Sequence, residues 1–291
     1  MGILRGLSQV LTAMLVLAFL HSGSPALAEP PALAEEWKAL EPGLYYAEFD
    51  RGDESGSAVV ILRFDPMLFT FSLHMVSEEG QPPRTLRQWA DKHNLVAAIN
   101  ASMYLPDGRT STGYMRHGEH VNNRRVVGRF GAFFVAGPDT TVLPSAALLD
   151  RETEDWQERL SHYSVVVQNY RMINSQRRIL WSPGGPLYSI SAVGQDGEGN
   201  ILFIHCREPI EAYSFASLLL HLPIDVRTVM YVEGGAQAGL ALRTSLYSRV
   251  WEGRHMADFL ITGKVNATLP NILGVTRREQ SPLQTPAIPD N

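Results

Sequence analysis

The stretch Thr228–Leu240, TVMYVEGGAQAGL, is the part of the chain that decides the fold. Its apolar run ends at a carboxylate, Glu233, and Gly234 and Gly235 follow at once. Such a run predicts a buried strand that breaks into a tight turn. Glu233 would then lie at the carboxyl end of a strand, where α/β folds tend to place ligand sites. The two glycines would let main-chain N–H groups approach a substrate closely, although the acid could also only end a strand.

A strand–helix–strand pattern leads into this stretch. Ile201–Cys206 is an apolar run typical of a strand. Glu211–Leu222 carries apolar residues at helical spacing, and Pro223 predicts the end of that helix. The strand that ends at Glu233 follows.

The same pattern occurs earlier in the chain. Leu68–Val76 reads as a strand. Thr85 and Gln88 have the spacing of a capping box, which opens a helix reaching His93. A further apolar strand then ends at Asn100. Because each unit leaves a polar residue at its exit, Asn100 and the acid of the opening stretch are the best candidates for a site.

The other regular patterns are mostly of β type. Leu44–Phe49, Ala58–Phe64 and Leu68–Val76 are expected to form a meander, with a turn at Asp65-Pro66, and Leu148–Leu160 is expected to be a charged peripheral helix. Many strands with few helices predict an α+β fold. We therefore expect a single domain with a mixed β-sheet core.

The start of the chain has the features of an export signal. A basic residue, Arg5, precedes the apolar core Val10–Leu20, and Ala26-Leu27-Ala28 offers a small-residue cleavage site. An uncleaved anchor is the alternative, but the apolar core is shorter than the ~20 residues that span a bilayer. We expect cleavage after Ala28, a secreted or periplasmic protein without a stable membrane anchor, a domain over 29–276 and a disordered proline-rich tail over 277–291.

Charge and cysteine content exclude some functions. The formal net charge is −5 with interspersed signs, whereas a nucleic-acid-binding protein would show a basic patch. The lone cysteine, Cys206, cannot form an intramolecular disulfide. It adjoins His205, which raises the alternative of a cysteine hydrolase. Successive strand residues face opposite sides, however, so the two side chains should not meet.

Several sequence blocks between about Leu40 and about Val275 resemble the phosphodiester glycosidases. The blocks are Val96–Tyr104 (VAAINASMY), Gly113–Met115, Asn122-Asn123, Gly131–Phe134, Gln168–Ile173, Ile201–Arg207 and Val229–Gly235. Members cleave the bond between the anomeric carbon of a sugar and a phosphodiester, and the bacterial relatives are exported. The resemblance implies a hydrolase whose substrate is a carbohydrate or phosphoglycan, such as an exopolysaccharide.

The chain departs from the family pattern at two places. Many members end the last strand with Asp, three glycines and Ser, whereas here Glu233 is followed by Gly234, Gly235, Ala236 and Gln237. Many also carry an arginine where this chain has Ile190. These departures leave open a non-catalytic carbohydrate-binding or envelope-assembly protein on the same fold.

The chemistry of a sugar phosphodiester assigns roles to the candidates. Arginine can hold two phosphate oxygens at once, which suits Arg207 and Arg171. Glu233 is the strong candidate for acid–base work, and with Arg207 and Asn100 it makes the predicted catalytic set. Four further acids compete for the role of a second carboxylate, and the sequence does not rank them: Asp107, Glu119, Asp196 and Glu208.

Other polar and aromatic residues are expected to contact the substrate. The amide of Asn100 can hydrogen-bond sugar hydroxyls, and Tyr104 could stack on a sugar ring. Gln168 and His205 complete the predicted substrate contacts, although His205 also fits a packed histidine of an apolar strand. No spacing suggests a zinc site, so no cofactor is required by the sequence. Carboxylates and carbonyls could hold Ca²⁺, which stays an open alternative.

Overall fold

A computed structural model describes residues 36–53, 56–152, 155–254 and 267–279, which belong to one compact unit. The predicted signal peptide lies outside the described residues, and so does nearly all of the predicted tail. Among the described residues, no helix is long and apolar enough to cross a membrane.

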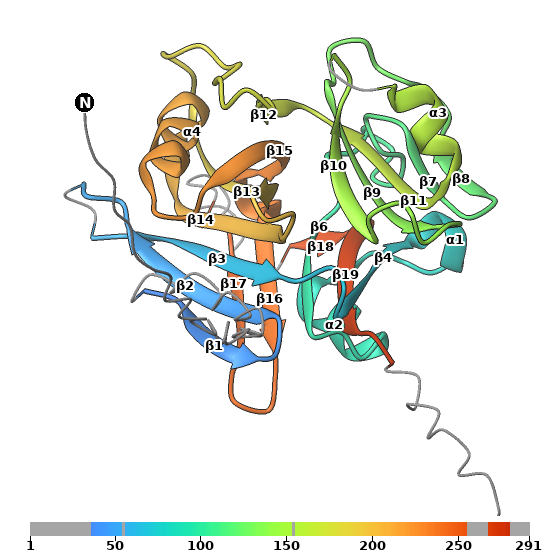
Figure 1. Cartoon of the computed structure of the whole chain (residues 1–291), viewed down its shortest axis with the longest axis horizontal. Coiled ribbons are helices and arrows are strands. Elements are labelled where there is room, and N and C mark those ends of the chain that lie inside the picture. The colour runs from blue at the N-terminus through green and yellow to red at the C-terminus, as the bar shows by residue number, and fades with distance from the viewer. Residues whose placement is uncertain (1–35, 54–55, 153–154, 255–266, 280–291) are drawn as a thin grey trace, which may run out of the picture. The chain divides into compact units, whose positions relative to one another are not determined.

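The largest sheet has seven strands, and the strand that carries Glu233 lies next to one edge of it (Figure 1). In spatial order the strands are β1 (Lys38–Glu41), β2 (Leu44–Asp50), β3 (Ala58–Phe64), β14 (Ile201–Glu211), β13 (Leu187–Asp196), β15 (Val226–Gly234) and β12 (Arg171–Ile173). Strands far apart in the sequence are thus neighbours in the sheet, and β15 carries Glu233 at its end.

The other described strands form two five-stranded sheets and one short ladder. One sheet has the order β17 (Ser248–Glu252), β16 (Gly239–Arg243), β6 (Ala97–Asn100), β19 (Asn271–Arg277) and β4 (Phe69–Met75). The other has the order β10 (Ala146–Asp150), β9 (Ala132–Pro138), β11 (Tyr163–Asn169), β7 (Met115–His117) and β8 (His120–Asn123). The ladder pairs β18 (Thr268–Leu269) with β5 (Arg84–Thr85).

All three large sheets contribute side chains to one buried core. Its centre is a set of phenylalanines in edge-to-face contact: Phe64 and Phe203 from the seven-stranded sheet, Phe69 and Phe71 from β4, and Phe134 from β9. Edge-to-face packing matches the positive ring edge to the negative ring face. The three large sheets therefore share one core.

Two strand–helix–strand segments share one topology. β14, α4 (Ala212–His221) and β15 follow one another along the chain, and β13 lies between the two strands. β4, α2 (Leu86–Lys92) and β6 follow one another in the same way, apart from the short α1 (Val76–Glu79) and β5, and β19 lies between those two strands. Because the middle strand is antiparallel to both neighbours, the two strands of each unit are parallel without touching.

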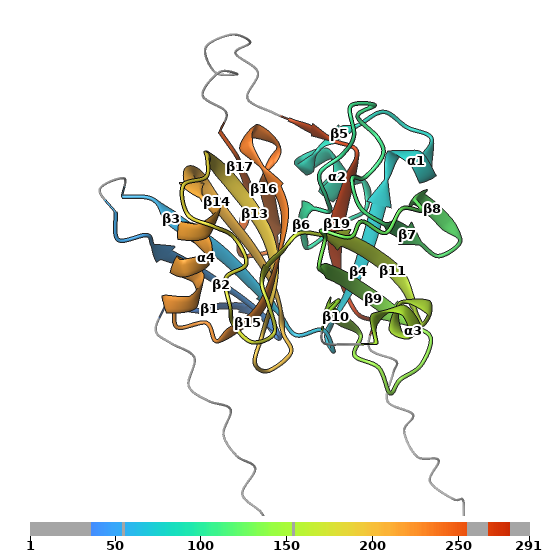
Figure 2. The same cartoon turned by 90° about the horizontal axis from the view of Figure 1, so that it is seen from above.

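Local sequence explains both helices. In α2, the hydroxyl of Thr85 accepts from the N–H of Gln88 at 3.2 Å, and the side chain of Gln88 accepts from the N–H of Thr85 at 2.9 Å. This is the expected capping box. In α4, Phe215, Ala216 and Leu219 form a buried face, which packs on the side of the seven-stranded sheet that faces away from β9 and β11 (Figure 2).

Two expectations about the strands and one about a helix need correction. Every ladder between described strands is antiparallel, so the sheets are not mixed. β4 pairs with β19 and not with β3, so the turn at Asp65-Pro66 connects two sheets rather than closing a meander. The expected helix over Leu148–Leu160 is instead the end of β10 followed by the short α3 (Trp156–Ser161).

The predicted domain boundary also shifts slightly. β19 ends at Arg277, one residue inside the segment that was expected to be tail. Arg277 pairs with Phe69 of β4, and its guanidinium forms an ion pair with Glu41 at 2.7 Å. Strand pairing therefore orders the chain to this point.

Candidate active site

Glu233 lies in the wall of a cavity of about 360 Å³ at the end of β15. The cavity is lined by Tyr188, Tyr231, the turn from Glu233 to Gln237, and Ala267. The ladder between β13 and β15 shifts register here, because Ser191 faces Glu233 while the next residue, Ala192, faces Tyr231. Such a bulge re-aims side chains and is common next to active sites.

Burial controls the acidity of Glu233. The residue is 7% exposed, and its Oε1 accepts a hydrogen bond from the N–H of Gly234 at 2.8 Å. Burial raises the pKa of Glu233 to about 8, against the opposing effect of that hydrogen bond. The carboxyl group is therefore mostly protonated at neutral pH, and it can donate a proton into the cavity that it lines.

Two tyrosines lie within electrostatic reach of Glu233. Burial, and then the charge of Glu233, raise the pKa of Tyr104 to about 12, and the same two causes raise the pKa of Tyr231. A Cβ at Gly234 would overlap the Tyr231 hydroxyl, so only glycine lets this hydroxyl lie against the turn. Both phenols remain neutral hydrogen-bonding groups beside the carboxyl.

Asn100 holds the turn that follows Glu233. Its side-chain amide donates to the carbonyl of Gln237 at 2.6 Å and accepts from the N–H of Gly239 at 2.8 Å. The residue is buried at the end of β6. In this structure Asn100 positions the wall of the cavity, which differs from the direct catalytic contact that was predicted for it.

Two other predicted substrate contacts are engaged inside the protein. Gln168 is fully buried, and its amide binds only main chain: it accepts from Tyr114 and Val127 and donates to Val127 and Phe130. His205 is also fully buried, with Nδ1 3.1 Å from the Ser191 hydroxyl. Burial lowers the pKa of His205 to about 3, so the ring is neutral. Neither side chain lines the cavity of Glu233, because both are enclosed by the neighbouring strands and loops.

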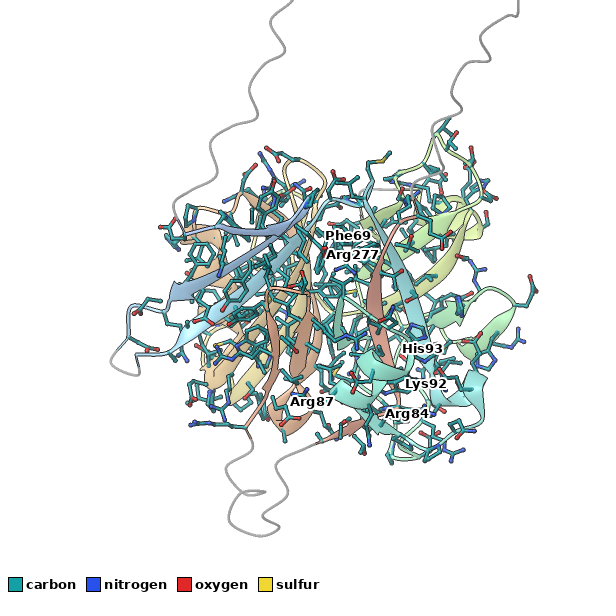
Figure 3. All side chains as sticks on the ribbon, turned by 90° about the horizontal axis from the view of Figure 1, so that it is seen from below. Phe69, Arg84, Arg87, Lys92, His93 and Arg277 are labelled. Atoms are coloured by element: carbon teal, nitrogen blue, oxygen red, sulfur yellow. The ribbon has the colours of Figure 1, made fainter. Side chains whose placement is uncertain are left out.

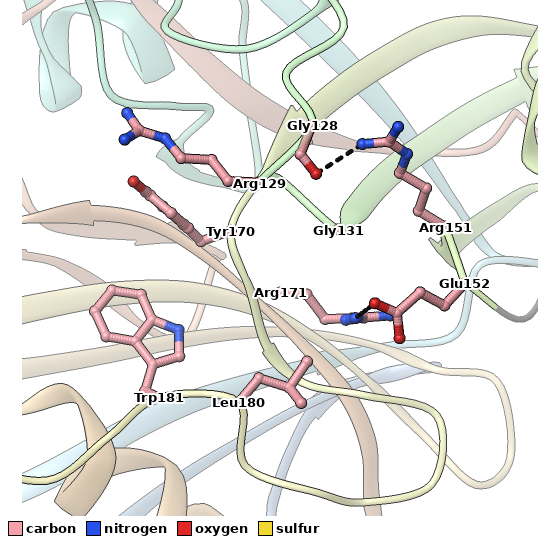
Figure 4. Close-up of a pocket in the computed structure, with 9 residues that line it drawn as sticks. All are labelled: Gly128, Arg129, Gly131, Arg151, Glu152, Tyr170, Arg171, Leu180 and Trp181. Atoms are coloured by element: carbon pink, nitrogen blue, oxygen red, sulfur yellow. Dashed lines mark hydrogen bonds and ion pairs between the residues drawn. The ribbon is translucent and has the colours of Figure 1, made fainter.

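The two predicted phosphate-binding arginines lie away from Glu233. Arg171 lines a separate cavity, where it forms ion pairs with Asp150 and, at 2.7 Å, with Glu152 (Figure 4). Arg207 is exposed on β14, two strands across the sheet from β15, and donates to the carbonyl of Glu252 at 3.2 Å. Neighbouring strands are ~4.8 Å apart, so the backbone of Arg207 is roughly 10 Å from that of Glu233. Neither arginine contributes to the pKa shift of Glu233.

The four candidates for a second carboxylate have other partners or other places. Asp107 accepts from the N–H groups of Arg109 and Thr110 in a turn, and Glu119 follows Gly118 between β7 and β8. Asp196 pairs with Arg63 at 2.8 Å, and Glu208 pairs with Arg254 at 2.8 Å. Among the described residues, none of these acids lies beside Glu233 in the cavity wall.

The cysteine hydrolase alternative has no support in the geometry. Cys206 is buried, and burial raises the pKa of its thiol to about 11. The thiol donates to the carbonyl of Glu208 at 3.3 Å, while His205 bonds to Ser191 on the neighbouring strand. Without a thiolate or a histidine partner, Cys206 behaves as a packed strand residue.

A cluster of His74, Glu79 and His93 offers three ligand atoms within 4.8 Å of one another. The two imidazole rings are stacked with centroids 3.8 Å apart, and Glu79 also pairs with Arg84 and Lys92. Arg84, Lys92 and His93 lie close together in Figure 3. Two cations on one carboxylate disfavour a metal ion there, and nitrogen ligands do not suit Ca²⁺. We interpret the cluster as an ion-pair network that joins α1, α2 and β4.

Comparisons with known proteins identify the family of the chain. The family model of the phosphodiester glycosidases matches residues 93–276, which include Asn100 and the whole turn after Glu233. The chain belongs to the phosphodiester glycosidase family. The resemblance inferred from the sequence blocks is therefore confirmed. No curated protein sequence matches the chain significantly.

Solved structures share the fold at low identity. The catalytic domain of zebrafish N-acetylglucosamine-1-phosphodiester alpha-N-acetylglucosaminidase, auto-inhibited by its pro-peptide, has a TM-score of 0.58 and 13% identity, over 83% of this chain and 86% of that one. A Synechocystis protein has a TM-score of 0.56 and 12% identity, over 81% of this chain and 62% of that one. A Burkholderia pseudomallei protein described as exported has a TM-score of 0.51 and 9% identity, over 76% and 74%.

Sequence reasoning missed two tyrosines of the cavity wall. Tyr231 lies two residues before Glu233 on the same strand, and an i, i+2 spacing puts both on one face of an unbulged strand. That spacing was a usable signal. Tyr188 opens the exposed start of β13 and had no signal of its own, because only the pairing of β13 with β15 brings it to the site.

Proposed function

We propose that this member of the family is an exported hydrolase that cleaves the bond between the anomeric carbon of a sugar and a phosphodiester. The single observation that carries the proposal is the buried Glu233, protonated at neutral pH in the wall of a tyrosine-lined cavity. Glycosidases use a carboxyl group with a raised pKa as the general acid. The proposed substrate is a glycan or exopolysaccharide with phosphodiester links.

The proposed reaction breaks the bond between C1 of the sugar and the phosphate oxygen. The electron pair of that bond goes to the oxygen, which takes the proton of Glu233 as it leaves with the phosphomonoester. A water molecule forms the new bond to C1 and gives up one proton, which restores the acid form of Glu233. In this scheme one carboxyl group serves both steps, because Glu233 donates its proton to the leaving oxygen and then accepts the proton that the attacking water gives up.

The surrounding residues suit a sugar in the proposed role of substrate. Tyr231 and Tyr188 offer ring faces and hydroxyls in the same wall as the carboxyl. A negatively charged phosphodiester beside Glu233 would raise the pKa of Glu233 further, because like charges disfavour ionisation. The substrate would then help to keep the general acid protonated.

The direct test is release of free sugar from a panel of sugar-1-phosphodiesters. The purified protein should release sugar and a phosphomonoester in equal amounts, and the Glu233→Gln protein, which keeps the shape of the side chain, should release far less. We propose that no metal is needed, so treatment with EDTA should leave the rate unchanged. Loss of activity that Ca²⁺ restores would instead support the open calcium alternative.

A second candidate is a non-catalytic carbohydrate-binding or envelope-assembly protein. The observation in its favour is that the described residues place no second carboxylate beside Glu233. Under this alternative the wild-type protein binds sugar-1-phosphodiesters and releases nothing from any of them. Release by the wild type and not by the Glu233→Gln protein would exclude it.

The proposal of export rests on the basic, apolar and small-residue pattern of residues 1–28. Mass spectrometry of the protein recovered from periplasm or medium should find a chain that begins at Glu29. Recovered protein that keeps Met1 or Gly2 would contradict cleavage.

A further inference from the structure

A second and larger cavity, of about 810 Å³, has three arginines among the residues that line it (Figure 4). Arg129 comes from the segment before β9, Arg151 follows β10, and Arg171 opens β12. A neighbouring cavity of about 470 Å³ shares Gly128 and Arg129 with it and adds Arg125. Four arginines from three segments of the chain therefore line two adjoining cavities.

Most of this positive charge is not neutralised by the protein. Arg125, Arg129 and Arg151 form no ion pair within the parts of the chain that the structure describes. Only Arg171 has acidic partners, Asp150 and Glu152. Arginines without carboxylates, gathered at a cavity, attract anions and steer them into it.

The arginines are held in place by neutral contacts instead. The guanidinium of Arg129 lies 5.6 Å from the ring centre of Tyr170 and 5.4 Å from that of Phe130. Arg151 donates through one nitrogen to the carbonyl of Gly128 at 2.8 Å. A guanidinium has five N–H donors. Stacking on a ring uses none of them and the contact of Arg151 uses one nitrogen, so both side chains keep donors for a ligand.

Arg171 adds a buried donor without a partner. The residue is 9% exposed, and its Nε is buried with no hydrogen bond. A Cβ at Gly131 would come within 3.0 Å of Nε, so glycine at that position leaves the space in which Nε lies. A buried unpaired donor costs free energy, which a bound acceptor could recover.

Aromatic rings connect this region to the candidate active site. Trp181 lines the arginine cavity, and its ring centre is 5.6 Å from that of Tyr170 and 5.4 Å from that of Tyr231. Tyr231 in turn lines the cavity of Glu233. A short oligosaccharide could therefore touch both cavities, with its sugar rings along the aromatic side chains between them.

We propose that the arginine cavity is a subsite for an oxyanion, phosphate or carboxylate, carried by a sugar residue next to the cleaved bond. The inference rests on the proposed function and narrows its substrate to glycans that carry a further acidic group on the sugar next to the cleaved phosphodiester. A guanidinium can donate two parallel hydrogen bonds to two oxygens of one carboxylate or phosphate. A neutral sugar offers no such pair of charged oxygens.

Binding of small sugars that cannot be hydrolysed tests the subsite. Glucose 6-phosphate, glucuronate and glucose are titrated into the purified protein and followed by calorimetry. At least one of the two anionic sugars should bind at least about tenfold more tightly than glucose, as expected for a charge-assisted contact. The comparison of the two anions distinguishes a phosphate subsite from a carboxylate subsite.

Matched variants locate the binding. Arg129→Gln removes one exposed and unpaired guanidinium, and Arg227→Gln removes an exposed arginine at the opposite end of β15. Arg129→Gln should weaken binding of the anionic sugar at least about tenfold, whereas Arg227→Gln should leave it unchanged. Equal binding of all three sugars, or equal effects of the two variants, would overturn the subsite.

The outcome is separable from the proposed function. If the wild type hydrolyses phosphodiesters but Arg129→Gln changes neither the binding of anionic sugars nor the KM for an acidic substrate, only the subsite is wrong. If anionic sugars bind through Arg129 and no phosphodiester is hydrolysed, the subsite stands and the hydrolase proposal fails. With both correct, Arg129→Gln raises KM for a phosphodiester whose sugars carry an additional acidic group, leaves kcat within about twofold and does not change KM for a phosphodiester of otherwise uncharged sugars.

Discussion

Glu233 combines features that neutralise a carboxylate with features that keep it accessible. It is almost fully buried, has no cationic partner among the causes of its pKa shift, and still lines an open cavity. A structural acid at a strand end would pair with a cation or face solvent, and its pKa would stay low. A carboxyl group that keeps its proton near neutral pH suits the role of a general acid.

The first prediction concerns the chemistry of this one side chain. Glu233→Gln keeps the size and hydrogen bonding but cannot transfer a proton, so kcat should fall by at least about 10²-fold. Binding of the substrate should change much less, since an amide also donates and accepts. Steady-state kinetics on a sugar-1-phosphodiester measures both. A folded Glu233→Gln protein with the wild-type rate would remove Glu233 from the mechanism.

The second prediction concerns pH. If the protonated form of Glu233 is the active one, kcat/KM should be maintained at neutral pH and decline as pH rises through about 8. An ordinary glutamate, with a pKa near 4.5, would place this decline in the acid range instead. A pH–rate profile between pH 5 and 10 decides between them, and a profile that rises through pH 8 would assign Glu233 the role of a base.

At the scale of elements, the site is built where strands of two sheets end. β15 brings Glu233, and β6 brings Asn100, whose amide bonds to Gln237 and Gly239. The turn between β15 and β16 thus has a side-chain support that is distant in sequence. A positive φ of 73° at Gly235 adds a second requirement, because residues with a side chain rarely adopt it.

The third prediction follows from that support. Asn100→Ala leaves the buried N–H of Gly239 without its acceptor, so the free energy of unfolding should fall by about 1–3 kcal/mol. Asn100→Asp keeps the acceptor but loses the donor to Gln237, so it should recover part of that loss. Urea unfolding measures the stability. In both variants kcat should also fall, because the turn after Glu233 is held less firmly. An Asn100→Ala protein of unchanged stability would show that the two bonds contribute nothing.

At the scale of the whole molecule, the sheets enclose polar groups as well as the phenylalanine core. His205 is fully buried, and burial lowers its pKa to about 3. His74 is largely buried, and burial followed by the charge of His93 lowers its pKa to about 4. Both rings are neutral in the folded protein, whereas both ionise with a pKa near 6.5 once the chain unfolds.

The fourth prediction is a loss of stability in mild acid. Below pH 6.5 the two histidines bind protons in the unfolded chain but not in the folded protein. Their contribution to the free energy of unfolding is therefore complete above pH 6.5 and is lost as pH falls toward 4. Glu233 acts in the opposite sense, since its raised pKa favours the folded state at acid pH and loses this contribution as pH rises from 4.5 through 8.

Thermal unfolding between pH 4 and 8 measures these contributions. Replacing His74 or His205 with glutamine should flatten the decline below pH 6.5, by an amount of the order of a few kcal/mol for the buried His205. Glu233→Gln should remove the loss of stability that Glu233 causes as pH rises toward 8. Wild-type and histidine variants with parallel curves would show that neither ring stays neutral in the folded protein.

Local patterns of residues were enough for the individual elements. The capping box of Thr85 and Gln88, the apolar face of α4 and the glycine-terminated strand of Glu233 depend on neighbours within a few positions, where side-chain and backbone preferences act directly. The motif blocks were likewise enough for the family. The helix expected from Leu148 failed because Ala146–Asp150 pairs with β9, and that tertiary pairing overrides a local preference.

The sequence by itself therefore determined most of the elements and the family, and it singled out Glu233 as the candidate to test. Only the tertiary structure decided which residues surround it, since strand order brings Tyr188 to its cavity, places Asn100 against the turn that forms the wall and leaves Arg207 two strands away. It also decided that Gln168 and His205 are enclosed and that Glu233 keeps its proton. The physical reason is that strand pairing and burial depend on contacts between residues far apart in the chain. These contacts set where each side chain points and whether an ionisable group is charged.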